Sequence, residues 1–532
     1  MKKLVSFALA LCMLLALSLP ALAEAPAKYD PPIAISVGRS VQSTWTYPEG
    51  DDLSNNIWYR EYRDAMGISI EHEWTALSAD YSQKCNVTIV SGDIPDLFQV
   101  SASQLSTLVE AEMLCDMTEV YEQYASPLTK SLLSGDGGLA LGSATFDGKL
   151  YGLPYVSANF YEPSLLWVRQ DWLDNLGLAV PTTIDEVLAV AKAFKEQDPD
   201  QNGLDDTGGL AFSNYLFDGI TSLTGFFNGF HAYPNTWVTQ EDGSVKFGST
   251  LPEMKTALAT LAQAYQDGLI DTEFAVKDSA KVSEEVIGGK YGISYGQNWN
   301  VYQYGVGLSA DPDMMWTPVA APSADDRRSM ASTGFSTNSY YVVSADCAHP
   351  EAVVQMLNVF TEIVYGDRRD EPDFIAVWEN GATIQQNHLA VVTTSTPDTL
   401  TEYALRQLVE AVETRNPDLL KDCVTETDKY QPCVEYMDNG NTDFYMQYHQ
   451  VKAFQVLVNE YGVDRLVRTA FGGTTETMSA KMGVLSNFLT DTFTQIIMGE
   501  EPVDAFDAAV EEWYRMGGDQ ITKEVNDWVA LH

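Results

Sequence analysis

Oxygen-bearing side chains recur at alternate positions in the stretch Asp-Pro-Asp-Gln-Asn-Gly-Leu-Asp-Asp, which begins at residue 198. This spacing matches the first nine places of an EF-hand loop, a turn that directs oxygen atoms toward one hard cation. The donors would be the side chains of Asp198, Asp200, Asn202 and Asp206 and the main-chain carbonyl of Leu204. Ca²⁺ takes about six to eight oxygen ligands, but Gly209 stands where the bidentate glutamate normally lies.

The sequence therefore predicts a Ca²⁺ site that a distant carboxylate completes or that binds weakly. The alternative is an ordinary Asn-Gly turn surrounded by solvated acidic residues.

Residue patterns for covalent or phosphoryl chemistry are absent from the sequence. It contains no Gly-x-Ser-x-Gly, P-loop, Gly-x-Gly-x-x-Gly or His-Glu-x-x-His motif. The 6 histidines are scattered, and carboxylate pairs such as Glu284-Glu285 are expected by chance among 75 acidic residues. We therefore predict no catalytic residue and expect a protein that is not an enzyme.

A strand and two helices precede the acidic loop and would position it. The apolar run 165–168 followed by Arg169 indicates a buried strand. Asp171 is expected to cap a short helix that ends at Gly177. Thr183 and Glu186 form a capping box for a second, amphipathic helix.

The stretch from Trp167 to Glu186, followed by the acidic loop, resembles the extracellular solute-binding proteins of ABC importers, in their carbohydrate-binding class. The Gly-Asp-Ile-Pro-Asp turn at 92–96 and the C-terminal helices over 493–526 match the same family. The resemblance runs from about Ile33 to the end and is weakest over 365–443. It implies capture of a carbohydrate, expected to be an oligosaccharide, by lobe closure and its delivery to an ABC transporter permease.

The fold expected from this resemblance is α/β, with two lobes of the periplasmic-binding-protein type joined by several hinge crossings. The strand, helix, strand order of the first hundred residues independently indicates a mostly parallel α/β lobe. We expect an N-terminal lobe of residues 28–156 plus about 325–375. The C-terminal lobe would hold residues 157–324 plus about 376–532.

Aromatic and amide side chains beside predicted strand ends and crossings are the candidates for ligand contacts. They are Trp45, Tyr161, Trp237, Tyr295, Asn298 and Trp299. Aromatic rings cover the flat C–H faces of sugars, and amides bond their hydroxyl groups. Core packing explains Trp45 and Trp237 equally well, so Trp299 is the strongest candidate. The aromatic stretch 212–237 either lines a cavity or is a buried irregular segment.

Two other functions fit the same features. A secreted polysaccharide-degrading enzyme would also be acidic, aromatic-rich and calcium-binding, with two carboxylates facing each other across a cleft. The same fold could instead bind a peptide or another polar solute.

The chain is strongly acidic, with a formal net charge of −44. Such a charge makes nucleic acid and anionic membrane surfaces poor partners, because both repel it, and we expect neither as a partner. With 45% hydrophobic residues the chain can bury a large core. We expect a monomer.

The N-terminus has the pattern of a signal peptide over residues 1–23: Lys2-Lys3, an apolar run, then Ala21-Leu22-Ala23. This predicts an extracellular or periplasmic protein. Cys12 follows a leucine rather than a small residue, so we expect no lipid anchor. Five of the 6 cysteines remain after cleavage, and Cys423 and Cys433 are the expected disulfide because they close a short loop.

Overall fold

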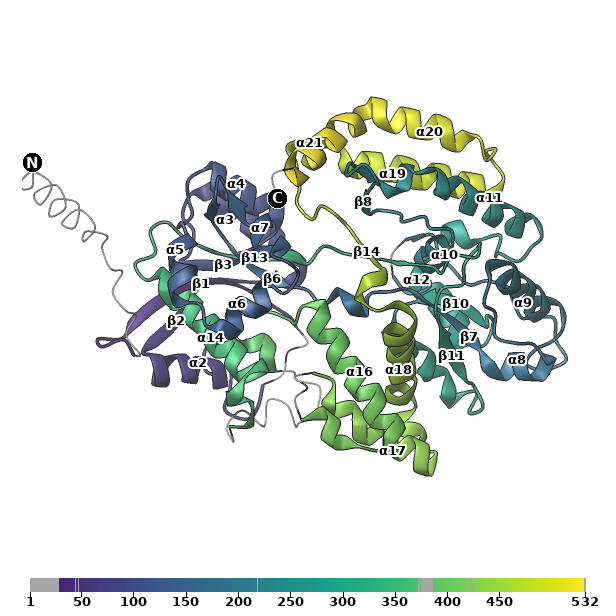
Figure 1. Ribbon diagram of the computed structural model, residues 1–532, viewed down its shortest axis with the longest axis horizontal. Coiled ribbons are helices and arrows are strands. Elements are labelled where there is room, and N and C mark those ends of the chain that lie inside the picture. The colour runs from purple at the N-terminus through teal and green to yellow at the C-terminus, as the bar shows by residue number, and fades with distance from the viewer. Residues whose placement is uncertain are drawn as a thin grey trace, which may run out of the picture.

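The computed structural model describes residues 28–530, except 44, 46, 218, 372–373, 375–385, 422 and 424. The predicted signal peptide lies outside these residues. Two α/β halves lie side by side, and the chain passes between them more than once (Figure 1). The two-lobed fold expected from the sequence is therefore confirmed.

The first half is built on a five-stranded sheet with the order β2-β1-β3-β13-β6. Strand β1 is parallel to both β2 and β3, whereas β13 is antiparallel to β3 and to β6. The strands are β1 Ile33–Val41, β2 Ile68–Leu77, β3 Leu97–Val100, β6 Leu153–Val156 and β13 Thr337–Val343. The chain goes from β1 to one neighbour and then to the other, so its direction of winding reverses at β1.

Helices cover this sheet, and a small hairpin precedes β6. The helices are α2 Ile57–Glu61, α3 Ser78–Ser91, α4 Ala102–Glu110, α5 Thr118–Tyr124, α6 Pro127–Leu133, α7 Leu139–Ser143 and α14 Pro350–Tyr365. The hairpin joins β4 (Thr145–Phe146) to β5 (Lys149–Leu150) through Asp147 and Gly148. Both turn residues have positive φ, as the Asp-Gly pair predicts for a tight hairpin.

The second half contains a three-stranded antiparallel sheet, β10-β7-β11. Its strands are β7 Leu165–Arg169, β10 Ile293–Gly296 and β11 Trp316–Val319. Leu166 and Val168 of β7 enter one hydrophobic core, whereas Leu165 and Trp167 enter the core on the opposite face. Because both faces are covered, β7 is apolar without alternation.

Many helices surround this second sheet. They are α8 Gln170–Leu176, α9 Ile184–Glu196, α10 Thr224–Gly229, α11 Pro252–Gln266, α12 Ser279–Ile287, α13 Val301–Tyr304, α16 Asp398–Thr414, α17 Tyr430–Asn439, α18 Tyr445–Val456, α19 Glu476–Met498, α20 Ala505–Trp513 and α21 Asp519–Val529. The remaining strands are β8 Trp237–Thr239, β9 Val245–Phe247, β12 Ala331–Thr333 and β14 Leu466–Arg468.

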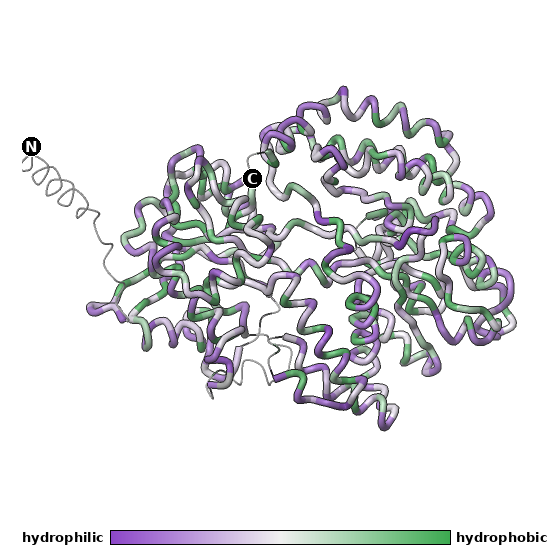
Figure 2. The backbone as a smooth tube through the Cα atoms, in the orientation of Figure 1, coloured by the Kyte–Doolittle hydropathy of each residue, from purple (hydrophilic) through white to green (hydrophobic). Residues whose placement is uncertain are grey.

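Helix α16 lies on the side of the second half toward the first, and α19–α21 lie together along its edge (Figure 1). Figure 2 shows hydrophobic residues concentrated where strands and inner helices meet, and hydrophilic residues along outward helices such as α20. Within the described residues, no helix combines the length and hydrophobicity needed to cross a bilayer.

The stretch from Trp167 to Glu186, which we call the signature stretch, is held together by a buried arginine. Arg169 is 1% exposed and donates to both carboxylate oxygens of Asp171, at 2.8 and 2.5 Å. It also donates to Asp311 at 2.7 Å and lies 4.8 Å from the ring centroid of Trp172. The predicted cap by Asp171 is wrong, because its carboxylate binds Arg169 and α8 begins without a side-chain cap.

Two other local predictions for this stretch are confirmed. Gly177 ends α8 in the left-handed conformation, with φ 65°. Thr183 and Glu186 form the capping box at the start of α9.

The chain crosses between the halves at 157–164, 334–336 and 393–397. Asp398, at the end of one crossing, accepts hydrogen bonds from the Phe160 amide at 2.7 Å and from Arg468 at 2.7 Å. The first core contains β13 and α14, in the predicted range 325–375, but also Leu389 and its neighbours. The predicted start of the second lobe at about 376 is therefore too early for this segment.

The predicted Cys423–Cys433 disulfide is wrong for this structure. Cys433 is a thiol whose sulfur lies 3.7 Å from the carbonyl oxygen of Gln447. The sulfur of Cys423 lies 3.8 Å from the carbonyl oxygen of Leu419. The two cysteines are close in sequence, but the sulfur atom of each contacts a different part of the chain.

Candidate functional site

The strand directions show which edge of the first sheet faces the second half. Strand β6 is parallel to β1 and β3, because β3 and β6 both lie antiparallel to β13 and β1 lies parallel to β3. The chain leaves the carboxyl end of β6 at Val156 to cross to the second half. The carboxyl ends of β1 and β3 therefore face the same way, where binding sites of open α/β sheets lie.

A pocket of about 370 Å³ lies at this edge, between the ends of β1 and β3. Its aromatic lining includes Trp45, Tyr81, Phe98, Tyr155 and Tyr341, and its polar lining includes Arg39 and Gln99. Of these, only Trp45 was predicted from sequence. The others escaped because they come from separate strands and helices that only the fold brings together.

Arg39 organises one wall of this pocket. It is buried and donates to the hydroxyl of Tyr59 at 2.6 Å and to the carbonyl of His388 at 2.7 Å. Its guanidinium lies 5.9 Å from the Trp45 ring, and the rings of Trp45 and His388 are 4.5 Å apart. These contacts fix the Trp45 ring at the pocket wall.

Neutral hydrogen-bonding groups complete the lining. Gln99 donates to Ser339 at 2.9 Å, and the hydroxyls of Tyr341 and Thr393 share a hydrogen bond of 2.9 Å. Burial raises the pKa of Tyr341 and of Tyr155, so both keep their protons at neutral pH. The wall thus offers aromatic faces and uncharged hydroxyl and amide groups.

The second half presents the loop after β10 toward the crossings. Gly296, the last residue of β10, pairs with Leu165, the first residue of β7 after the crossing. The turn 298–300 therefore lies at the cleft-facing end of the second sheet. Trp299 in this turn is 41% exposed. Its predicted contact with a ligand stays a prediction.

Asn298 and Tyr161 support this turn. Asn298 is 1% exposed, and its amide donates to the Tyr161 carbonyl at 2.8 Å and accepts from Gln450 at 2.8 Å. Both amide atoms are thus used inside the protein, which gives Asn298 a positioning role here. The Tyr161 hydroxyl donates to Glu426 at 3.0 Å. Burial, reinforced by the Glu426 charge, raises the pKa of Tyr161 well above its ordinary value.

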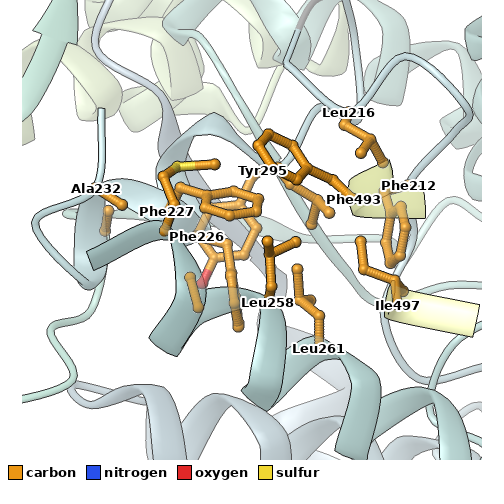
Figure 3. Close-up of a cluster of buried hydrophobic side chains, with 14 of the residues drawn as sticks. Phe212, Leu216, Phe226, Phe227, Ala232, Leu258, Leu261, Tyr295, Phe493 and Ile497 are labelled. Atoms are coloured by element: carbon orange, nitrogen blue, oxygen red, sulfur yellow. The ribbon is translucent and has the colours of Figure 1, made fainter. Parts of the chain in front are cut away.

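Two predicted ligand residues lie in the core instead. Tyr295 is 0% exposed, and Figure 3 shows it among Phe226, Phe227 and other apolar side chains. A Cβ on Gly225 would lie 2.6 Å from the Tyr295 ring, so this glycine lets α10 pack directly on it. Trp237 is 5% exposed, with its ring centroid 5.1 Å from that of Phe247. Neither ring offers a face to a ligand, because helices cover both.

The same packing resolves the aromatic stretch 212–237. Phe226 and Phe227 on α10 are fully buried, whereas Tyr215 is 56% exposed, so the described part of the stretch is mostly buried in this structure.

The acidic loop gathers its oxygen atoms around Asn202. The Asn202 side-chain nitrogen lies 2.8 Å from an oxygen of Asp200 and 3.2 Å from one of Asp206. The carboxylate of Asp198 accepts from the main-chain amides of Asn202 at 3.1 Å and of Gly203 at 3.0 Å. Burial raises the pKa of Asp200, and the neighbouring carboxylates of Asp198 and Asp206 raise it further.

Such mutual repulsion is the kind that a bound cation relieves. The donor set is chemically suited to a hard cation. However, no set of three or more His, Cys, Asp or Glu side chains in the described residues has the geometry of a metal site.

Two α/β halves are linked by short crossings, and the first carries a lined pocket at the strand ends from which the chain crosses. This arrangement is that of a two-lobed solute-binding protein. Residues 65–362, more than half of the chain, match the family model described as bacterial extracellular solute-binding protein, and the chain belongs to that family.

Curated relatives extend the match to most of the chain. The chain is 24% identical over 479 residues to a protein named Lipoprotein LipO from Bacillus subtilis, with 86% of each chain covered. It is 29% identical over 238 residues to the fructooligosaccharide ABC transporter substrate-binding protein FusA from Streptococcus pneumoniae, covering 42% of this chain and 43% of FusA.

Solved structures share the fold at low sequence identity. A human-milk-oligosaccharide-binding (HMO-binding) solute-binding protein from Bifidobacterium longum infantis superposes with a TM-score of 0.65 at 17% identity, covering 94% of this chain and 99% of that chain. An EF-hand mutant of FusA in complex with fructo-nystose superposes with a TM-score of 0.62 at 16% identity, with coverages of 94% and 99%.

Proposed function

We propose that this protein captures a carbohydrate, in the form of an oligosaccharide, between its two lobes and delivers it to an ABC transporter permease. The observation that carries this proposal is the pocket at the carboxyl ends of β1 and β3, whose lining combines aromatic rings with neutral hydrogen-bonding groups. Sugars need both kinds of surface. The family match and the names of the relatives support the same ligand class.

Lobe closure would couple binding to shape. The first lobe offers Trp45 and its neighbours, and the second offers Trp299 from the opposite side. A sugar held by both surfaces favours the closed arrangement, because only that arrangement completes the contacts and excludes water. A permease can then distinguish the loaded protein from the empty one. The solute is bound without being altered.

Calorimetry after a thermal-shift screen with oligosaccharides tests this proposal. The variant Trp299→Ala should bind the selected sugar about 1–3 kcal/mol more weakly, roughly 5- to 150-fold in Kd. The matched control is Tyr215→Ala, which also removes an exposed aromatic ring from the second half but leaves the affinity unchanged. Equal affinity of Trp299→Ala and wild type would refute the role of Trp299.

A polysaccharide panel tests the enzymatic alternative. No new reducing ends should appear on incubation with the protein. Turnover would replace the binding function with a hydrolytic one.

The cellular setting is part of the same proposal. The protein acts as a monomer outside the cytoplasmic membrane after removal of residues 1–23, without a lipid anchor. The lobes comprise approximately the predicted residue ranges, with residues 325–333 in the second lobe and the segment around Leu389 in the first. Mass spectrometry of the secreted protein should find an unmodified N-terminus at Glu24. A lipid-modified cysteine would contradict this part of the proposal. The measurement is informative because one relative of this protein is named Lipoprotein LipO.

The acidic loop would hold a structural Ca²⁺. Its ligands would be the side chains of Asp198, Asp200, Asn202 and Asp206 and the carbonyl of Leu204. The mutual repulsion that raises the pKa of Asp200 supports this assignment. A chelator should lower the melting temperature, added Ca²⁺ should restore it, and Asp200→Asn should reduce the response. A melting temperature indifferent to both additions would refute the site.

A further inference from the structure

A long groove runs along the free edge of β11, and none of its lining residues lines the pocket at the ends of β1 and β3. It consists of two cavities of about 620 and 500 Å³ that share Val456 and Glu460 in their walls. One wall follows the chain from Met315 to Ser329, and much of the other is formed by α18 and the turn after it. We call this the β11 groove. Its described lining residues all belong to the second half, so it exists without lobe closure.

A pair of tyrosines lines one end of the β11 groove. The rings of Tyr436 and Tyr448 stack with centroids 4.6 Å apart and an interplanar angle of 25°. Both side chains are half-buried, and Lys452 holds its ammonium 5.6 Å from the Tyr448 centroid. Pro318 on β11 adds a further apolar surface. Rings placed in this way at the wall of an open groove are suited to the flat face of a sugar.

His449 also lines this cavity and is unusual among its lining residues. It is 6% exposed, and its ring lies 4.1 Å from that of Tyr445 and 5.2 Å from that of Tyr448. Neither ring nitrogen has a side-chain hydrogen-bond partner, although buried polar atoms normally have a partner. Burial lowers the pKa of His449 to about 4, and the main chain of Trp316 acts in the opposite direction. A neutral imidazole offers one donor and one acceptor, which two sugar hydroxyls can use.

The strand edge itself is closed to a peptide. Pro318 has no N–H to donate. The N–H of Trp316 already donates to the hydroxyl of Tyr445 at 3.0 Å, and that of Ala321 to the hydroxyl of Tyr461 at 2.8 Å. A peptide that adds a strand needs these groups free. Recognition in the groove must therefore rely on side chains.

We propose that the β11 groove is a second carbohydrate-binding site, which holds a stretch of a polysaccharide chain against the second lobe. The tyrosine pair takes a sugar face, His449 takes hydroxyl groups, and the groove extends along β11 for further residues of the chain. The site works independently of the cleft, so the protein can hold a polymer there while the cleft remains open to a short oligosaccharide.

Native affinity electrophoresis of the full mature chain tests this proposal. The gels contain soluble inulin, polygalacturonate, xylan or mixed-linkage glucan. The Trp299→Ala variant should still be retarded by at least one polymer, whereas Tyr448→Ala should bind that polymer about ten-fold more weakly or worse. Tyr215→Ala serves as the control for removing an exposed ring. The proposal is overturned if the polymer retards Tyr448→Ala as strongly as wild type. It is also overturned if no polymer retards any of the variants.

A second measurement leaves Tyr448 in place, so it does not depend on how that variant folds. Long-range ¹H–¹⁵N spectra resolve the imidazole nitrogens, and the chain has only 6 histidines. In the Trp299→Ala background, the signals of His449 should shift when oligosaccharide fragments of the retarding polymer are added. Unchanged His449 signals at saturating fragment overturn the proposal. Failure of cleft binding would appear separately, as equal calorimetric affinity of wild type and Trp299→Ala.

Discussion

Replacing Tyr295 with phenylalanine separates a core role from a ligand-binding role at this position. The Tyr295 hydroxyl is fully buried and lacks a hydrogen-bond partner. A buried hydroxyl without a partner costs about 1–3 kcal/mol, and phenylalanine keeps the ring that packs edge-on against Phe226. Tyr295→Phe should therefore stabilise the protein by about 1–2 kcal/mol. The melting temperature should rise by about 2–4 °C for each kcal/mol.

Urea denaturation followed by fluorescence, together with calorimetric titration of the selected sugar, measures both effects. Tyr295→Phe should raise the denaturation midpoint and leave the affinity unchanged. Trp299→Ala, four positions along the chain, should leave the denaturation midpoint unchanged and weaken the affinity, because the Trp299 ring is exposed. A loss of sugar affinity in Tyr295→Phe without stabilisation would refute the reasoning, since it would mean that the hydroxyl reaches the ligand.

Three further predictions concern the framework. Arg169→Met should destabilise the second half by about 3 kcal/mol, because it leaves two carboxylates without their buried partner; circular dichroism during denaturation would measure this, and an unchanged midpoint would contradict it. His449 is neutral in the folded protein, with its pKa lowered from 6.5 to about 4, whereas the unfolded chain takes up a proton below about pH 6.5. Stability should therefore fall by up to about 3 kcal/mol as the pH drops from 6.5 to 4, His449→Gln should reduce that fall, and identical pH profiles would contradict the assignment. Thiol titration of the denatured mature chain should count all five cysteines, including Cys433; a count of three would indicate the disulfide.

The buried ion pairs also explain why the signature stretch is informative about the family. Arg169, Asp171 and Trp172 fasten β7 to α8, and Asp311 adds a segment from far along the chain. None of them lines the interlobe pocket described above. The stretch therefore identifies the fold through its framework, and ligand specificity lies in other residues.

Local features were determined by the sequence itself. The Thr183–Glu186 capping box and the stop at Gly177 involve residues that are at most a few positions apart, and each formed as expected. The apolar run 165–168 likewise predicted the buried strand β7. Such features depend on backbone conformation and neighbouring side chains, which a sequence states directly.

Only the tertiary structure decided the environment of the site residues. Tyr295 and Trp299 are four positions apart, yet α10 covers the first and leaves the second exposed. The pocket joins Arg39 to His388, which are 349 positions apart, and no local pattern marks that contact. The physical reason is that exposure and pairing depend on which distant elements pack over a strand end, and these contacts form only when the whole chain folds.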